Sequence, residues 1–126
     1  MVIFYADDDE DDRYLFNEVI KRINPDIIII EAEDGSDAVH ILSQAQINLP
    51  DIIFLDINMP LLNGYETLLE LRKNERLKNT KFVLYSTADK MSLPSARKNG
   101  LNVQYVRKSN TLKDSIETLR AVIYPA

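Results

Sequence analysis

Five short apolar runs, each followed by a segment of helical periodicity, constrain the fold of this 126-residue chain more than any other feature. The runs are rich in β-branched residues and too short for buried helices, which favours strands. They cover residues 2–6, 26–32, 52–56, 81–85 and 103–106. Parallel neighbours in a sheet need crossover connections, which helices supply. The alternation therefore predicts an α/β fold, with a doubly wound, five-stranded parallel sheet covered by helices on both faces.

The helices are predicted from apolar residues that recur with a period of 3.6 residues. Four such segments are expected, at residues 11–23, 38–45, 65–72 and 112–123. The sequence TLKD at residues 111–114 has the pattern of an N-terminal cap for the last of them. A further short helix is expected around Pro94, because proline is tolerated in a first turn and Gly100 supplies a C-terminal cap.

Length and charge narrow the class of protein. The length fits one domain, residues 1–126, and we expect no output domain. The net charge is −5 and no stripe of Lys and Arg is present, which argues against autonomous nucleic-acid binding. Cysteine is absent, no apolar run approaches the ~20 residues of a membrane span, and Met1 leads into a strand without a basic leader. We therefore expect a cytoplasmic module that does not enter a membrane.

Polar side chains follow four of the five predicted strands. They are Asp7 and Asp8 after the first strand, Asp56 after the third, Ser86 and Thr87 after the fourth, and Lys108 after the fifth. The carboxyl ends of parallel strands meet at one edge of a sheet, and ligands bind there. These side chains are therefore expected to share a site.

The residue types at this edge indicate the chemistry. Asp7, Asp8 and Asp56, with no cysteine and no nearby histidine, make a hard, oxygen-only site that suits Mg²⁺ better than zinc or copper. The ammonium group of Lys108 can balance a carboxylate at rest and a phosphoryl oxygen later. A hydroxyl at the end of the fourth strand can donate to the same phosphoryl group. Such an assembly describes a site that accepts a phosphoryl group on an aspartate.

The same residues carry a resemblance to a known family. The motifs are the pair DD at residues 7–8, DG at 34–35, DINMP at 56–60, P-x-x-N-G at 60–64, ST at 86–87 and YVRKS at 105–109. In this order they resemble the receiver domain of two-component response regulators of the chemotaxis-regulator type, from Val2 to Ile123. The resemblance implies a flavodoxin-like sheet with strand order 2-1-3-4-5.

The resemblance also implies a phosphoacceptor and a metal site. Asp56 would take a phosphoryl group from a histidine kinase or a phosphotransfer protein. Asp8 and Asp56 would bind Mg²⁺ directly, Asp7 would act through water, and Asn58 would contribute its main-chain carbonyl.

Further roles come from the same resemblance. Ser86 falls on the switch hydroxyl, Thr87 on the small-residue position after it, and Lys108 on the family's lysine. Tyr105 matches the aromatic position that moves inward on phosphorylation. The chain would be a switch able to catalyse its own phosphorylation and dephosphorylation, rather than a conventional enzyme. Its signal would leave through contact with a target protein, which the sequence does not name, or through a phosphorelay.

Two positions depart from the family pattern. Ser109 follows Lys108 where the family usually has proline across a cis bond, and a cis bond before any other residue costs ~2.5–4 kcal/mol. The bond is therefore expected to be trans, or cis and held by its surroundings. Pro94 is expected to shorten the fourth helix, which forms part of the surface that receivers present to targets.

The acid run that includes Asp7 and Asp8 divides into two parts. Residues 9–12, which are all acidic, lie where the first helix should begin. Carboxylates at the N-terminus of a helix interact favourably with its dipole, by ~0.3–1 kcal/mol each when exposed. These four side chains therefore need no metal.

Three rival functions compete with the phosphoacceptor switch. A receiver-shaped module that is never phosphorylated would be expected to lack one of the acidic residues or the lysine. A phosphohydrolase of the haloacid dehalogenase class would want an aspartate two positions after Asp56, where this chain has Asn58. A calcium loop in the acid run would need a glycine at its sixth position and a distant glutamate.

Overall fold

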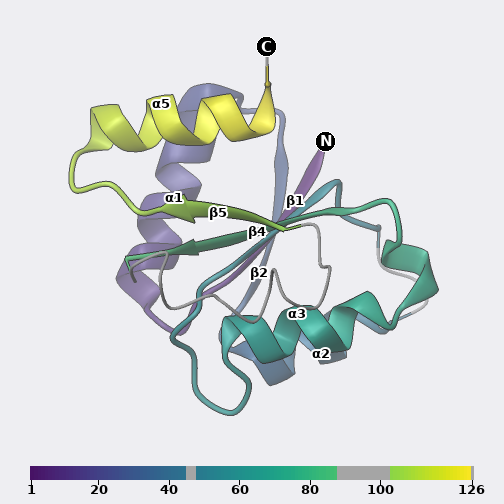
Figure 1. Cartoon of the computed structure of the whole chain (residues 1–126). Coiled ribbons are helices and arrows are strands. Elements are labelled where there is room, and N and C mark those ends of the chain that lie inside the picture. Colours follow the sequence, from purple (N-terminus) through teal and green to yellow (C-terminus); the bar gives the residue numbers. More distant parts are fainter. Residues whose placement is uncertain (45–47, 88–102, 126) are drawn as a thin grey trace.

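The computed structural model describes residues 1–44, 48–87 and 103–125, and it shows a parallel sheet with helices on both faces (Figure 1). The strands are β1 (Val2–Ala6), β2 (Ile28–Ala32), β3 (Ile52–Leu55), β4 (Lys81–Ser86) and β5 (Gln104–Arg107). Their order in the sheet is β2-β1-β3-β4-β5, and every neighbouring pair is parallel. The predicted doubly wound architecture and strand order are confirmed.

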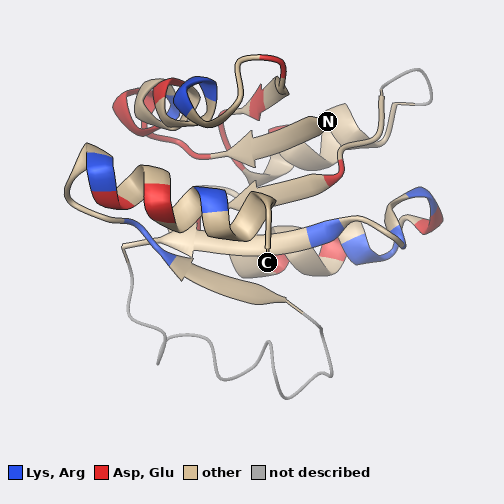
Figure 2. Cartoon of the chain, turned by 90° about the horizontal axis from the view of Figure 1, so that it is seen from above, with Lys and Arg blue, Asp and Glu red and all other residues tan. Residues whose placement is uncertain are grey.

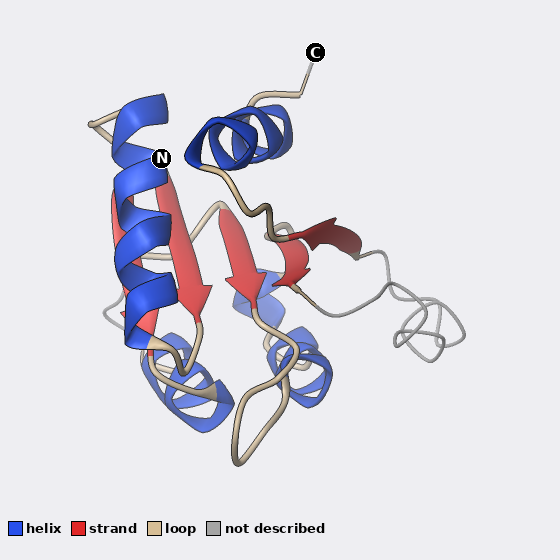
Figure 3. Cartoon of the chain, turned by 90° about the vertical axis from the view of Figure 1, so that its left-hand side faces the viewer, coloured by secondary structure: helices blue, strands red, loops and turns tan. Residues whose placement is uncertain are grey.

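Helices cover the two faces of the sheet in pairs. They are α1 (Glu10–Ile23), α2 (Gly35–Leu42), α3 (Gly64–Arg72) and α5 (Leu112–Ile123), with a short 3₁₀ helix at Glu75–Leu77. Helices α1 and α5 lie on one face, and α2 and α3 lie on the other (Figures 1 and 3). The central strands are consequently buried on both faces, which explains their nearly continuous apolar sequences.

Successive residues of each strand feed two separate cores, because side chains alternate between the faces of a sheet. Ile3 and Tyr5 of β1 pack with α1 and α5, whereas Phe4 and Ala6 pack with α2 and α3. Each of these four residues is 0% exposed. The β1 strand therefore packs against the helices on both faces of the sheet. Asp7 and Asp8, which follow it, are attached to a well-packed strand end.

The boundaries of the elements differ from the prediction at β2 and α2. The strand begins at Ile28 rather than at residue 26, because Asn24 accepts hydrogen bonds from the main-chain N–H groups of Asp26 and Ile27 and holds them in a turn. This strand is also at the edge of the sheet, so that Ile28 is 56% exposed. Four consecutive isoleucines thus mark an edge strand, not a fully buried one.

The later strands shift by one residue. β3 ends at Leu55, β4 extends to Ser86 and β5 runs from Gln104 to Arg107. The 3₁₀ helix was not predicted. Helix α2 begins and ends three residues earlier than the predicted range of 38–45, because the side chain of Asp34 caps its N-terminus and Ser43 is its C-cap. The expected helix near Pro94 lies outside the described residues.

Two local features fix the loop that follows β3. Asn63 and Glu66 form a reciprocal cap at the start of α3, and Gly64 donates its main-chain N–H to the carbonyl of Ile57 at 2.9 Å. A Cβ atom at Gly64 would lie 2.2 Å from the main-chain oxygen of Asp56. The absence of a side chain at Gly64 therefore lets α3 begin directly against the strand end that carries Asp56.

Candidate functional site

Three carboxylates converge at the carboxyl edge of the sheet. Asp7 and Asp8 follow β1, Asp56 follows β3, and these two strands are neighbours. Oxygen atoms of the three side chains all lie within 4.8 Å of one another. Asp7 is 0% exposed and Asp56 is 7% exposed, whereas Asp8 is exposed. The sequence predicted this convergence, and the structure brings the three residues together.

Hydrogen bonds fix Asp7 from several directions. The hydroxyl of Tyr5 donates to Asp7 Oδ2, and the main-chain N–H of Asp9 donates to Asp7 Oδ1 at 3.0 Å. The guanidinium of Arg13 donates to the main-chain oxygen of Asp7 at 2.7 Å. Sequence reasoning missed Tyr5, although a side chain two residues earlier on the same strand points to the same face.

Lys108 joins the carboxylates from β5. Its Nζ lies 2.6 Å from Asp7 Oδ2, 3.0 Å from Asp12 Oδ2 and 3.7 Å from Asp56 Oδ2. The lysine side chain is only 11% exposed. The predicted meeting of Lys108 with Asp7 and Asp56 is confirmed, and Asp12 is an additional partner that the sequence analysis treated only as a helix-terminal charge.

The backbone around Lys108 is held by the neighbouring strand. Its N–H donates to the main-chain oxygen of Ser86 at 3.0 Å, which continues the pairing of β5 with β4 by one residue. No peptide bond in the described ranges is cis, so the Lys108–Ser109 bond is trans. Of the two conformations that the sequence left open, the structure has the unstrained one.

The electrostatics of the site differ between its two buried carboxylates. Burial raises the pKa of Asp56 to about 6, against the attraction of Lys108 and with the repulsion of Asp7. Burial acts on Asp7 in the same direction, but hydrogen bonds from Lys108, Tyr5 and the Asp9 N–H outweigh it and hold the Asp7 pKa below its usual value. Asp7 is therefore the firmly ionised partner, and Asp56 is the carboxylate whose charge is least compensated.

The lysine and the tyrosine respond to the same charges. Burial alone would lower the pKa of Lys108, but its hydrogen bonds to Asp7 and Asp12 and the charges of Asp56 and Asp7 raise that pKa above its usual value. Burial and the Asp7 charge raise the pKa of Tyr5 as well. The site thus contains a stable ammonium group and a neutral phenol beside its carboxylates.

Four further residues were predicted to belong to the site. Ser86 is 1% exposed, and its hydrogen bond to Asp56 lowers the pKa of that carboxyl, whereas Thr87 is exposed. Tyr105 is half-buried in β5 and packs against the core on the α2 and α3 side. Asn58 lies two residues after Asp56 with an exposed side chain. Its carbonyl as a metal ligand and the switch motions of Ser86 and Tyr105 stay predictions.

The acid run leaves the strand and enters α1 as expected (Figure 2). Asp9 is the N-cap, and its side chain accepts hydrogen bonds from the N–H groups of Asp11 and Asp12. Glu10, Asp11 and Asp12 lie in the first helical turn. Because a helix begins at Glu10, the run does not form the loop that a calcium-binding site of the EF-hand type requires.

The donor set of the site fits a hard divalent cation. Asp7, Asp8 and Asp56 offer only carboxylate oxygens, and one of the three side chains is exposed, so that an ion can retain water ligands. Mg²⁺ is bound in this manner in proteins, through one or two carboxylates together with phosphate oxygens. The cluster is thus capable of holding Mg²⁺.

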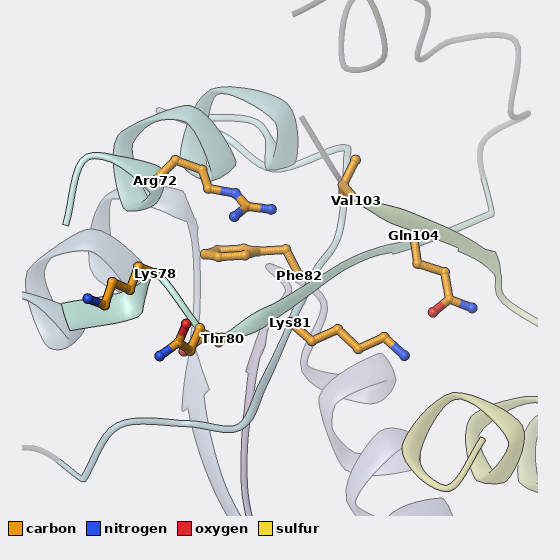
Figure 4. Close-up of a pocket in the computed structure, with 8 residues that line it drawn as sticks. Arg72, Lys78, Thr80, Lys81, Phe82, Val103 and Gln104 are labelled. Carbon is orange, nitrogen blue, oxygen red and sulfur yellow. The ribbon is translucent and has the colours of Figure 1, made fainter. Parts of the chain in front are cut away.

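A hollow lies at the amino ends of β4 and β5, on the far side of the sheet from the carboxylates. It has a volume of about 450 Å³ and is lined by Arg72, Lys78, Lys81 and Phe82, among others. The guanidinium of Arg72 lies 4.6 Å from the centre of the Phe82 ring. The charged ends of Lys78 and Lys81 point away from the Arg72 guanidinium, in different directions (Figure 4). These cations do not converge on one anion.

None of the helices in the described part of the chain has the length and apolar character needed to span a bilayer.

Comparison with curated proteins finds relatives that are response regulators. The chain is 32% identical over 87 residues to protein PilG of Pseudomonas aeruginosa, a match that covers 69% of this chain and 61% of PilG. It is 29% identical over 126 residues to response regulator Rcp1 of Synechocystis sp., covering 96% of this chain and 85% of Rcp1. The chain thus spans less than two thirds of PilG and most of Rcp1.

Solved structures show the same fold with a metal ion. The Mn²⁺-bound form of Rcp1 superimposes with a TM-score of 0.80 at 29% identity and covers 96% of this chain and 90% of that one. Response regulator TrrA of Thermotoga maritima, in complex with Mg²⁺ and BeF, gives 0.73 at 27% identity over 96% and 97% of the two chains. Together with the acidic cluster described above, these structures support a divalent cation as the cofactor.

A model of the response regulator receiver domain matches residues 3–120, which is nearly the whole chain and includes every residue of the site. The sheet order, the acidic cluster and the lysine agree with that match. The chain belongs to the response regulator receiver domain family.

Proposed function

We propose that this chain is a phosphoacceptor switch in which Asp56 receives a phosphoryl group from a histidine kinase or a histidine phosphotransfer protein. The observation that carries the proposal is the meeting of Asp7, Asp8, Asp56 and Lys108 at one edge of the sheet. Three carboxylates and one ammonium group can hold a divalent ion and a phosphorylated side chain together.

In the transfer step, a carboxylate oxygen of Asp56 attacks the phosphorus of the donor. A P–O bond forms to Asp56, and the P–N bond to the donor histidine breaks. The electron pair of that bond stays with the imidazole nitrogen, which takes up a proton as it leaves. Bound Mg²⁺ supplies charge neutralisation for the phosphoryl oxygens.

The residues of the chain orient and neutralise the group. Asp8 and Asp56 would hold the ion directly, Asp7 through water and Asn58 through its carbonyl. Lys108 Nζ, which lies 3.7 Å from Asp56 Oδ2, is within a small movement of a phosphoryl oxygen on that atom. The buried hydroxyl of Ser86 is placed to donate to another oxygen.

The signal would follow from these new contacts. A phosphoryl group shifts the population toward the arrangement that binds it better, which requires differential contacts in the two states. Ser86 and Lys108 supply such contacts, and inward movement of Tyr105 would change the surface of β5. The domain of residues 1–126 would then bind a target protein or pass the phosphoryl group onward.

Incubation with Mg²⁺ and acetyl phosphate, followed by intact mass, tests the proposal. We expect one added phosphoryl group, which should be absent in Asp56→Asn and in the presence of EDTA. Asp51→Asn, at the amino end of β3, is a matched control and should be labelled normally. Labelling that persists in Asp56→Asn would contradict the assignment, and a receiver-shaped module without phosphorylation would show no added mass at all.

The phosphohydrolase alternative predicts a different time course. A hydrolase would release phosphate steadily over many turnovers without stable labelled protein, whereas the switch should accumulate the phosphorylated form. Colorimetric detection of phosphate beside the mass measurement separates the two.

A further inference from the structure

We propose that Asp12 is a positioning residue for phosphorylation, which holds the ammonium group of Lys108 beside Asp56. The proposal rests on the function proposed above and adds a residue outside the metal cluster. Asp12 Oδ2 lies 3.0 Å from Lys108 Nζ, closer than Asp56 Oδ2 at 3.7 Å.

The geometry divides the three N–H donors of the ammonium group. Two are taken by Asp7 at 2.6 Å and Asp12 at 3.0 Å. Because an ammonium has three donors, the third is left for Asp56 or for a phosphoryl oxygen on it. Asp7, at the end of β1, and Asp12, in the first turn of α1, thereby fix the position of Lys108 Nζ before the phosphoryl group arrives.

The Lys108 side chain is long and costly to order, although its Nζ also lies 5.7 Å from the centre of the Tyr85 ring. A lysine side chain carries up to ~2 kcal/mol of rotamer entropy. Ser109 and Asn110 follow Lys108, so no proline stiffens the loop. A hollow of about 270 Å³ lies alongside, lined by Asp12, Lys108 and Ser109 among others, and it offers the lysine other positions.

Asp12 is itself held in place. Its main-chain N–H donates to the N-cap side chain of Asp9 at 3.2 Å, and its carboxylate lies in the first turn of α1, where the helix dipole favours negative charge. The helix is fixed to the sheet through buried Phe16, whose ring stacks on Tyr5 with centroids 4.1 Å apart. The anchor is therefore part of the rigid frame, and it remains available when Asp7 is engaged by a metal ion.

The positioning role and simple electrostatics predict opposite results. A carboxylate near an anion-accepting site repels an anionic phosphodonor, so the loss of one negative charge alone should speed phosphorylation. Loss of an anchor for Lys108 should slow it, because the ammonium group must then be ordered in each reaction. The sign of the effect therefore distinguishes the two.

The test compares Asp12→Ala with Asp11→Ala in the full chain. Asp11 is exposed in the same helical turn and carries the same charge, but Lys108 Nζ forms no ion pair with it. With acetyl phosphate and saturating Mg²⁺, we expect Asp12→Ala to be phosphorylated about three- to five-fold more slowly than wild type, the size of one partly exposed ion pair. Asp11→Ala should be unchanged or slightly faster.

Two further variants separate positioning from a general loss of structure. Asp12→Glu, which retains the carboxylate, should recover part of the wild-type rate. In a Lys108→Ala background, Asp12→Ala should have no additional effect, because the residue acts through the lysine. Equal rates for wild type and Asp12→Ala, a faster Asp12→Ala, or an undiminished effect in the Lys108→Ala background would overturn the proposal.

The same experiment distinguishes failure of this inference from failure of the proposed function. If wild-type protein is labelled on Asp56 and only the Asp12 prediction fails, the switch function stands and the positioning role falls. If wild-type protein is not labelled on Asp56, the proposed function fails and the positioning role fails with it.

Discussion

Replacement of Asp56 by asparagine should stabilise the metal-free protein, although it removes the proposed phosphoacceptor. Asp56 is 7% exposed, and burial raises its pKa to about 6 despite the nearby charge of Lys108. The folded protein therefore disfavours the charged form of this carboxyl. Asparagine has nearly the same shape and cannot ionise, so that it resembles the protonated aspartic acid.

The size of the effect follows from the pKa. A rise from 3.8 to about 6 is roughly two pKa units, and each unit corresponds to about 1.36 kcal/mol, which gives ~3 kcal/mol. Between pH 3.8 and about pH 6, Asp56 is ionised in the unfolded chain but still protonated in the folded protein. The stability of the wild type that depends on Asp56 therefore falls as pH rises through this window, and the full cost is present at pH 7.5.

Urea unfolding followed by circular dichroism, in EDTA at pH 4.5, 6 and 7.5, measures this difference. We expect Asp56→Asn to exceed wild type by ~3 kcal/mol at pH 7.5, with a gap that shrinks toward pH 4.5. Asp11→Asn, an exposed substitution of the same kind, should show no comparable pH-dependent gain. Equal or lower stability of Asp56→Asn at pH 7.5, or a gap that does not change with pH, would refute the reasoning.

Three further predictions concern the metal and the loop after β3. Addition of Mg²⁺ should raise the melting temperature of wild type, because the ion binds the folded carboxylates and stabilises the folded state by ~2.7 kcal/mol at 100 times the dissociation constant. The difference in stability between Asp56→Asn and wild type should then become smaller. Calorimetry with and without Mg²⁺ would show no shift in melting temperature if the cluster does not bind the ion. Leu61 has a φ of 68° and is 78% exposed. Leu61→Gly should gain ~0.5–1 kcal/mol in urea unfolding, because relief of ~1–2 kcal/mol of left-handed strain is partly offset by the greater backbone entropy of glycine. Leu61→Ala, which retains the strain, should gain little, and equal effects of the two substitutions would argue against strain. Gly64→Ala should cost ~3 kcal/mol through overpacking, since its Cβ would meet the main-chain oxygen of Asp56 at 2.2 Å, and an unchanged unfolding midpoint would contradict this close contact.

The fold could be predicted from the sequence where a local signal and the tertiary environment agree. Thr111 caps α5 as the TLKD pattern predicted, and the helix has the predicted bounds of Leu112–Ile123. The start of β2 could not be placed, because the turn around Asn24 depends on side-chain hydrogen bonds that apolar periodicity does not report.

The candidate site was predictable at the level of strand ends, since parallel strands deliver their following residues to one edge. The contacts that side chains outside the strand ends make with the site could not be predicted. Asp12 meets Lys108 because the start of α1 and the residue after β5 come together at the carboxyl end of the sheet, across 96 positions of sequence. Likewise, Ser86 is buried and Thr87 is exposed because β4 ends at Ser86, one residue later than the predicted end of that strand.

A crystal structure with Mg²⁺ and beryllofluoride, which mimics a phosphoryl group on aspartate, tests the central claim most directly. We expect beryllium on Asp56 Oδ, the ion bound by Asp8 and Asp56, and Lys108 Nζ within hydrogen-bond distance of a fluorine. An ion bound away from the three carboxylates, or a lysine that remains turned from the occupied Asp56, would contradict it.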